Sequence, residues 1–292
     1  MGVFAFIRNI PNKLHISLLL MKLSIHNRLS RKSILSDTGP TLSMTTYGVR
    51  FQTAHLSLEA IARGKILPSR AILFVDDNEL FNQPTKGLRR LMKRGLEIQL
   101  VENFGPHTKY YPFLELVSDF DRPHATGDDD HIYPTWWLEK LSSSIKRNPE
   151  YLHAYRAHCI RLNETGTEAL PYLEWGPGIT TAPSNLNFYT SSMGEIYSPE
   201  FLRIAKQRGR EFLDSCPKND DLWLTSLAIE NDVPISLVDG INRTFPAIPA
   251  SQQLTLETTN VFGGYNDVQI RDTFTEKILE KLRESERQEN LR

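Results

Sequence analysis

The sequence has few cysteines, no long uncharged apolar run and almost no net charge. Its 292 residues hold only Cys159 and Cys216, too few for a disulfide framework or a four-cysteine zinc site, so we expect a reducing, cytoplasmic location. No window of about 18 apolar residues is free of charge, which argues against a membrane-spanning helix. The 34 basic and 35 acidic side chains nearly cancel, which excludes the general attraction to nucleic acid of strongly basic proteins.

One segment lacks acidic residues altogether. Residues 1–36 contain no Asp or Glu, but they carry six Lys or Arg side chains and a run of leucines. This pattern is typical of a basic amphipathic helix that lies on anionic lipid, so we expect peripheral contact through residues 1–36 with the inner face of the membrane. A helix packed on the main domain, or a frayed extension, is the alternative that the sequence leaves open.

After residue 40 the sequence alternates regularly between strand and helix patterns. We expect strands at residues 41–46, 71–75 and 96–101 and helices at residues 53–63 and 84–94. This order predicts an α/β fold with a mostly parallel sheet flanked by helices. Ligands of such sheets bind beyond the carboxyl ends of the strands, where Tyr47 and Asp76 lie.

The second half is less regular. We expect helices at residues 135–146 and 220–230, a strand or strand pair at 151–162, loops at 164–187, and a strand at 233–238. The resulting organisation is a basic N-terminal extension (1–39), a single main domain (40–250) and a C-terminal helical tail (251–292), whose last helix we expect to be exposed.

Three consecutive aspartates, Asp128, Asp129 and Asp130, form the most informative stretch. Like charges so close together repel one another unless a cation or solvent compensates. On an extended segment Asp128 and Asp130 point the same way and Asp129 points the opposite way. Two carboxylates on one face suit Mg²⁺ or Mn²⁺, whereas the alternative is a solvated acidic turn.

Four motifs together resemble glycosyltransferases of the GT-A fold, similar to family 2 and its bacterial polysaccharide branches. They correspond to the opening strand and nucleotide loop, the acidic end of the second strand, the DxD motif and the acidic helix start that supplies the base. In this chain they are Leu42–Arg50, Phe74–Asp77, Asp128–Asp130 and Cys216–Trp223. One departure is the segment 121–127 before the aspartates, because it contains Pro123 and few apolar residues where the family has an apolar strand. We therefore expect that strand to be very short or unusual in geometry.

The resemblance implies a metal-dependent, inverting hexosyltransferase-like enzyme of polysaccharide or glycoconjugate biosynthesis. Its cofactor is Mn²⁺ or Mg²⁺, its donor is by default a UDP-sugar, and its acceptor is a glycan or a lipid-linked molecule. Asp130 is then the direct metal ligand, Asp128 contacts the ribose or a metal-bound water, and Asp221 is the catalytic base with Asp220 in support. The residues expected to bind the nucleotide sugar are Thr46, Tyr47, Arg50, Asp76, Asp77, Lys109, Asp128 and Asp129.

Several of these residues have simpler interpretations. Asp220 or Asp221 suits the cap and first turn of a helix, and Asp76 and Asp77 suit a helix cap or a solvated loop. The segment 191–197 resembles the loop that lines the donor sugar, or it is an ordinary turn. A nucleotidyltransferase is the enzymatic alternative, although the loop 47–50 has only one glycine, and a non-catalytic sugar-binding protein is the alternative from another class.

Overall fold

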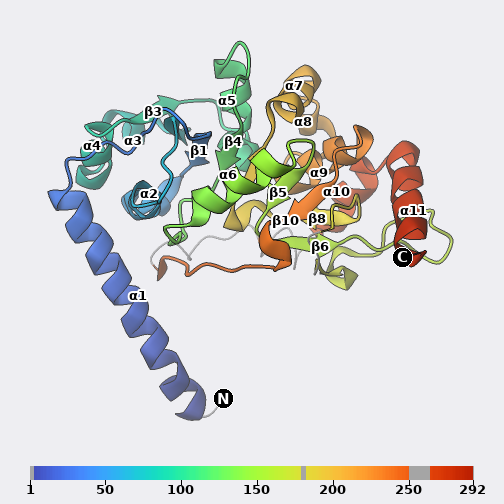
Figure 1. Cartoon of the computed structure of the whole chain (residues 1–292), viewed down its shortest axis with the longest axis horizontal. Helices are drawn as coiled ribbons and strands as arrows, with labels where there is room; N and C mark the ends of the chain where they lie inside the picture. Colours follow the sequence, from blue (N-terminus) through green and yellow to red (C-terminus); the bar gives the residue numbers. More distant parts are fainter. Residues whose placement is uncertain (1–2, 179–181, 250–263, 292) are drawn as a thin grey trace.

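The computed structural model of the chain describes residues 3–178, 182–249 and 264–291, with side chains from residue 13 onward. A seven-stranded sheet runs through this part of the chain in the order β10-β5-β9-β4-β1-β2-β3 (Figure 1). Neighbouring strands are parallel except where β9 pairs with β4 and with β5. The predicted α/β class, with a mostly parallel sheet flanked by helices, is confirmed.

The first half of the chain follows the predicted alternation. Helix α4 begins two residues later than expected, because Thr85 caps it by accepting a hydrogen bond from the backbone of Leu88. The elements are β1 (Thr41–Thr45), α2 (Ala54–Ala62), β2 (Arg70–Val75), α3 (Asn78–Asn82), α4 (Lys86–Met92) and β3 (Leu96–Leu100).

The central strand β2 shows why its apolar run is continuous. Ile72 and Phe74 belong to one hydrophobic cluster, whereas Leu73 and Val75 belong to the other. Because successive side chains of a strand point to opposite faces, β2 is buried on both sides by helices. The sheet therefore separates two hydrophobic cores, and polar side chains lie at its carboxyl edge, where the parallel strands end.

The strand that precedes the three aspartates is very short, as expected. β4 spans only His124–Thr126, because Pro123 lies immediately before it. The carbonyl of Pro123 still accepts a hydrogen bond from the backbone of Thr41, which extends the contact with β1 by one residue. On its other side β4 pairs with β9 (Glu195–Tyr197), the strand that brings Glu195 opposite Thr126.

The second half supplies the rest of the main sheet and a smaller one. Of the two expectations for 151–162, a strand or a strand pair, the pair is present, but β5 lies in the main sheet and β6 in the three-stranded sheet β7-β6-β8. The remaining elements are α5 (Tyr111–Leu116), α6 (Trp137–Arg147), β5 (Leu152–Ala154), β6 (Ala157–Cys159), β7 (Gly176–Pro177), β8 (Asn187–Tyr189), α7 (Pro199–Arg208), α8 (Phe212–Ser215), α9 (Asp220–Glu230), β10 (Ile235–Leu237) and α10 (Tyr265–Thr273).

The basic N-terminal segment forms one long helix, α1 (Val3–Leu29), which projects from one end of the molecule (Figure 1). Its last part packs against α2 and α4, and Leu23 is 1% exposed in that contact. The alternative of a helix packed on the main domain therefore holds for this part of α1. Within the described residues no helix combines the length and apolarity needed to cross a bilayer.

The expectation that the C-terminal helix α11 (Glu276–Asn290) is exposed holds for its charged face but is wrong for its apolar face. Ile278, Leu279 and Leu282 are buried against α9, in the same hydrophobic cluster as Phe212. A one-sided apolar stripe on a highly charged helix is enough to place it on the core, since the opposite face can remain in water.

Candidate functional site

Four loops meet at the carboxyl edge of the sheet. In the parallel register Thr45 lies beside Phe74, and Ser43 lies beside Thr126. The residues after β1, β2 and β4 therefore share one edge, and these include Tyr47, Asp76 and Asp128. The fourth loop contains the short 3₁₀ helix η2 (Gly105–Lys109), whose last carbonyl accepts a hydrogen bond from Ser43 Oγ at 2.6 Å.

The three aspartates lie in a turn and not on an extended segment, so the expected alternation of their side chains is wrong. Asp129 and Asp130 share one partner: Nη1 of Arg50 lies 3.3 Å from Oδ1 of Asp129 and 3.2 Å from Oδ2 of Asp130. Asp128 turns instead toward Lys109. The turn thus directs its carboxylates to two cations on two different loops.

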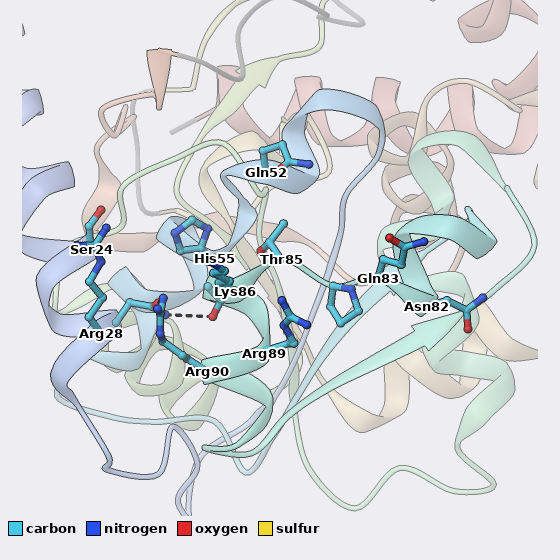
Figure 2. Close-up of a pocket in the computed structure, with 13 residues that line it drawn as sticks. Ser24, Arg28, Gln52, His55, Asn82, Gln83, Thr85, Lys86, Arg89 and Arg90 are labelled. Carbon is cyan, nitrogen blue, oxygen red and sulfur yellow. Dashed lines mark hydrogen bonds between the residues drawn. The ribbon is translucent and has the colours of Figure 1, made fainter.

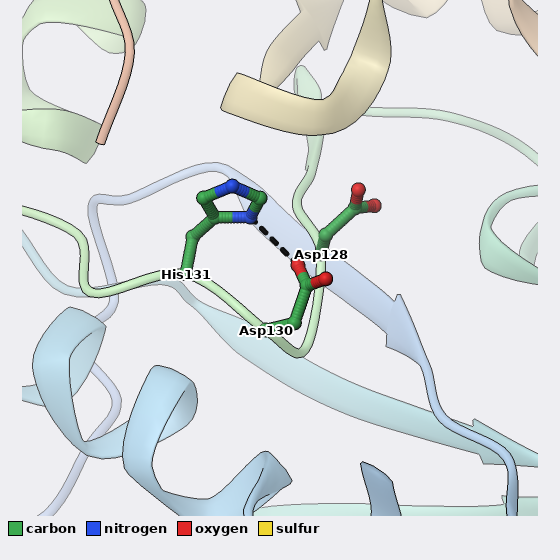
Figure 3. Close-up of side chains that lie close together, drawn as sticks. All are labelled: Asp128, Asp130 and His131. Atoms are coloured by element: carbon green, nitrogen blue, oxygen red, sulfur yellow. Dashed lines mark ion pairs between the residues drawn. The ribbon is translucent and has the colours of Figure 1, made fainter. Parts of the chain in front are cut away.

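His131 joins this turn, a residue that the sequence interpretation missed. Its Nδ1 lies 2.7 Å from Oδ1 of Asp130, and one donor atom each of Asp128, Asp130 and His131 lie within 4.8 Å of one another (Figure 3). Burial lowers the pKa of His131, but the contact with Asp130 outweighs burial and raises it. Its position directly after the aspartates could have indicated a place in the candidate metal site, because imidazole is a common metal ligand.

These donors are chemically suited to a divalent cation. Two carboxylates and an imidazole match the ligands that Mn²⁺ takes, and Mg²⁺ is bound through one or two carboxylates and substrate phosphates. Asp128, Asp130 and His131 would hold such an ion together, since one ligand atom of each already lies within 4.8 Å of the others. Binding would displace the proton from His131.

Lys109 lies between the acidic turn and helix α9. Its buried Nζ is 2.8 Å from Oδ1 of Asp128, 2.6 Å from Oγ of Ser191 and 3.4 Å from Oδ2 of Asp220. Burial by itself lowers the pKa of Lys109, but the carboxylates of Asp128 and Asp220 raise it well above its ordinary value. Lys109 is therefore a permanent cation that joins two segments more than 90 residues apart in the sequence.

The start of α9 separates its two aspartates. Asn219 is the cap, because its side chain accepts a hydrogen bond from the backbone of Leu222 at 2.9 Å. The alternative of Asp220 or Asp221 as that cap is therefore wrong. Asp220 faces Lys109, whereas Oδ1 of Asp221 accepts a hydrogen bond from the backbone N–H of Ser191 at 3.0 Å.

Burial makes both aspartates of α9 harder to ionise. Burial raises the pKa of Asp221 to about 7, with the charge of Asp220 adding to the effect and Lys109 opposing it. Burial likewise raises the pKa of Asp220, and the charge of Lys109 again opposes this shift. A carboxylate with a pKa near neutrality is suited to accept a proton at physiological pH.

Glu195 on β9 is a further buried carboxyl group that the sequence did not indicate. It is fully buried, accepts a hydrogen bond from the hydroxyl of Tyr197 at 3.0 Å and contacts the hydroxyl of Thr126. Burial raises the pKa of Glu195 well above its ordinary value, while the charge of Lys109 opposes this shift. Its role here is to fix β9 to β4 beneath the site.

The loop before β9 approaches helix α6 closely. Gly194 has a φ of 101°, and a Cβ at this position would lie 2.4 Å from the ring of Trp137. The indole N–H of Trp137 donates to the carbonyl of Met193 at 2.8 Å. Glycine is required here on both grounds, and it lets the segment hold Ser191 against Asp221.

The remaining predicted nucleotide residues lie along the same edge. The ring of Tyr47 stands 5.4 Å from the guanidinium of Arg50, and Thr46 is buried next to it. Burial raises the pKa of Asp129 to about 7, while Thr46 and Arg50 oppose this shift.

Asp76 and Asp77 follow β2 at this edge. Asp77 is exposed and caps α3, since Oδ1 accepts hydrogen bonds from the backbones of Glu79 and Leu80. Asp76 is half-buried. The structure therefore gives Asp77 a capping role, and nucleotide binding by either residue stays a prediction.

No protein-family model matches this chain, and a comparison with curated proteins gives no match. Similar solved structures include residues 1–349 of S. aureus TarS in complex with UDP-GlcNAc, at 14% identity over 83% of this chain and 70% of that chain, with a TM-score of 0.48. They also include 4-diphosphocytidyl-2C-methyl-D-erythritol synthase from Anaerococcus prevotii, at 11% identity over 80% and 97% of the two chains, with a TM-score of 0.45. Likenesses this distant, with TM-scores below 0.5, assign no activity to this chain.

Proposed function

We propose that the chain is a metal-dependent, inverting glycosyltransferase that moves a sugar from a nucleotide-sugar donor to an acceptor hydroxyl. One observation carries the proposal: the ammonium of Lys109 lies between Asp128 and Asp220. It brings the acidic turn after β4 and the acidic start of α9 to one site, as donor binding and proton removal by separate carboxylates require. Residues 40–250 carry this activity in our proposal.

The donor side of the site is the acidic turn with its cations. Asp128, Asp130 and His131 would hold Mn²⁺ or Mg²⁺, which when bound neutralises the diphosphate of the leaving nucleotide. Arg50 binds a phosphate oxygen, and Lys109 adds a second positive charge beside the diphosphate. The predicted contacts to base and ribose are those of Thr46, Tyr47, Asp76, Asp77 and Asp129, with a UDP-sugar as the default donor.

Asp221 is the base in this proposal. The acceptor oxygen forms a bond to the anomeric carbon while its proton passes to the Asp221 carboxylate. The bond from that carbon to the phosphate oxygen breaks, and its electron pair leaves with the nucleoside diphosphate. Attack on the face opposite the leaving group inverts the anomeric carbon. The N–H of Ser191 holds the carboxylate in one orientation throughout.

Release of UDP from a panel of UDP-sugars, with Mn²⁺ and with a chelator, tests the reaction class. The proposal predicts UDP release that needs the metal and increases when glycan or lipid-linked acceptors are added. A nucleotidyltransferase would instead release pyrophosphate from a nucleoside triphosphate and a sugar phosphate. Binding of UDP-sugar without any turnover in either assay would favour a non-catalytic sugar-binding protein.

A further inference from the structure

A polar cavity lies apart from the carboxylate site, between α1, the start of α2 and the loop before α4 (Figure 2). Its volume is about 770 Å³. Its wall contains no Asp or Glu but four cations, Arg28 from α1 and Lys86, Arg89 and Arg90 from α4. A cavity with this lining favours an anion that accepts several hydrogen bonds at once.

These charges have no compensating carboxylates nearby. Among the described residues none of the four cations forms an ion pair. The carboxylate of Glu59 contacts the cavity residue Asn27, but it is fully buried and already bound to Arg94 at 2.8 Å and to Nδ2 of Asn27 at 2.9 Å. The positive charge of the cavity is therefore not neutralised by an ion pair among the described residues, so it is available to an external anion.

The helix that forms one wall of the cavity also has an exposed apolar stripe. The side chains of the stripe are 43–73% exposed and follow one another at spacings of three or four residues, so they lie on one face of α1. They lie opposite Leu23, which is buried in the core. The stripe consists of Leu14, Leu18, Met21, Ile25 and Leu29.

The stripe and the cavity are adjacent on α1. Ser24, Asn27 and Arg28 line the cavity, and Arg28 also borders the stripe, with Lys22 exposed on the stripe's other flank. An apolar face bordered by cations is the arrangement that enters the boundary between headgroups and acyl chains. A second copy of α1 is disfavoured as the occupant, because residues 1–36 contain six cations and no acidic residue.

We propose that this cavity binds the phosphate of an anionic lipid headgroup while the stripe of α1 rests in the acyl region of the same bilayer. This inference goes beyond the glycosyltransferase reaction, which uses a different set of residues. It specifies the peripheral membrane contact expected for residues 1–36, since the charges on α4 contribute as well as those on α1. Binding through the cavity and the stripe would orient the molecule so that α1 and the N-terminal part of α4 face the membrane.

Vesicle co-sedimentation of the full chain tests the proposal, with vesicles of phosphatidylcholine alone and with about one-third phosphatidylglycerol. The cavity variant is Lys86→Gln with Arg89→Gln, because both side chains are exposed and their loss leaves the core intact. The matched control is Arg271→Gln with Lys277→Gln, two exposed cations on α10 and α11 at the other end of the molecule (Figure 1). The stripe variant is Leu18→Gln with Ile25→Gln.

The wild type is expected to bind the anionic vesicles, and the cavity variant to bind them roughly 30-fold more weakly, whereas the control stays near wild type. The stripe variant should also bind more weakly. Equal losses of vesicle binding in the cavity and control variants would overturn the proposal, as would a wild type that does not bind anionic vesicles.

Two further outcomes identify another occupant and also overturn the proposal. Inorganic phosphate that binds the cavity in calorimetry, together with a stripe variant that binds vesicles normally, would indicate a soluble anion. A dimer in analytical ultracentrifugation that the stripe variant dissociates would indicate a second copy of the chain. Metal-dependent release of UDP is expected to be unchanged in the cavity and stripe variants, so failure here and failure of the proposed reaction are distinguishable.

Discussion

The backbone N–H of Ser191 donates a hydrogen bond to Oδ1 of Asp221 at 3.0 Å, whereas its neighbour Asp220 faces Lys109. Two adjacent aspartates of one helix therefore have different surroundings. Burial raises the pKa of both carboxyl groups, but the ammonium of Lys109 lies against Asp220 and competes with a proton for that carboxylate, whereas Asp221 is bound by a neutral backbone donor. This difference favours Asp221 over Asp220 as the base.

Asp221→Asn is expected to lower turnover by roughly 10²- to 10⁴-fold, because an amide cannot accept the proton of the acceptor hydroxyl. Folding should be retained, because Asn219 is the cap of α9 and Asp221 is not. Steady-state kinetics together with calorimetric titration of UDP checks both points. Asp220→Asn serves as the comparison, and a larger loss of turnover in that variant than in Asp221→Asn would reverse the assignment.

The pH dependence of turnover follows from the pKa of Asp221. Burial and the charge of Asp220 raise this pKa to about 7, while Lys109 opposes the shift. Because a base acts only when it is ionised, kcat should rise about tenfold per pH unit below pH 7 and level off above it. The same rise in Asp221→Asn, measured between pH 5 and 9 at saturating metal, would show that another group titrates.

Asp130→Asn is expected to abolish Mn²⁺-dependent turnover in a protein that still folds. The carbonyl of Asp130, which accepts a hydrogen bond from the backbone of Ile248, is unaffected by this change, so the turn keeps its position. Electron paramagnetic resonance of added Mn²⁺ measures binding directly. Asp121→Asn removes an exposed carboxylate and should leave Mn²⁺ binding unchanged. Full turnover and Mn²⁺ binding in Asp130→Asn would contradict the metal assignment.

Lys109→Gln should lower the free energy of unfolding by about 3–5 kcal/mol, because it leaves Asp128 and Asp220 without their shared buried cation. Urea unfolding measures the loss, with exposed Lys93→Gln as the control. Adding Asp128→Asn to Lys109→Gln should restore part of the lost free energy of unfolding, because one of the two carboxylates left without a cation is then replaced by a neutral amide. Losses that simply add in the double variant would show that Lys109 and Asp128 do not interact.

The first half of the fold was predictable because its signals are local. The apolar run Ala71–Val75 and the bracketing of α4 by Pro84 and Gly95 need no knowledge of the rest of the chain. β9 was missed, because three residues are too few to show a period of two. Its position between β4 and β5 is set by tertiary pairing.

The residues of the site were easier to name than to place. The sequence singled out Asp128, Asp221 and Lys109, but only the fold shows that Lys109 reaches both acidic segments. Glu195 carries no signal in the sequence, because a glutamate in a short apolar stretch reads as a surface residue. Its burial follows from the pairing of β9 with β4.

α1 is a part of the core as well as a basic surface, and this changes what its removal would do. His26 and Asn27 both bind the buried carboxylate of Glu59, and Leu23 is 1% exposed. Deleting residues 1–36 would leave Glu59 with Arg94 alone and expose the apolar faces of α2 and α4. Point substitutions separate the two roles of the helix better than a truncation.

Leu23→Ala is accordingly expected to lower the free energy of unfolding by about 2–5 kcal/mol, the usual cost of a cavity at a fully buried leucine. Leu18→Ala, on the same helix but 43% exposed, should change it by less than about 0.5 kcal/mol. Urea unfolding of the two variants, followed by tryptophan fluorescence, compares substitutions of identical chemistry that differ only in the face of α1. Equal midpoints for the two variants would mean that α1 does not pack on α2 and α4 in solution. A lower midpoint for Leu23→Ala alone would show that one face of the helix stabilises the fold while the face of Leu18 contributes little to it.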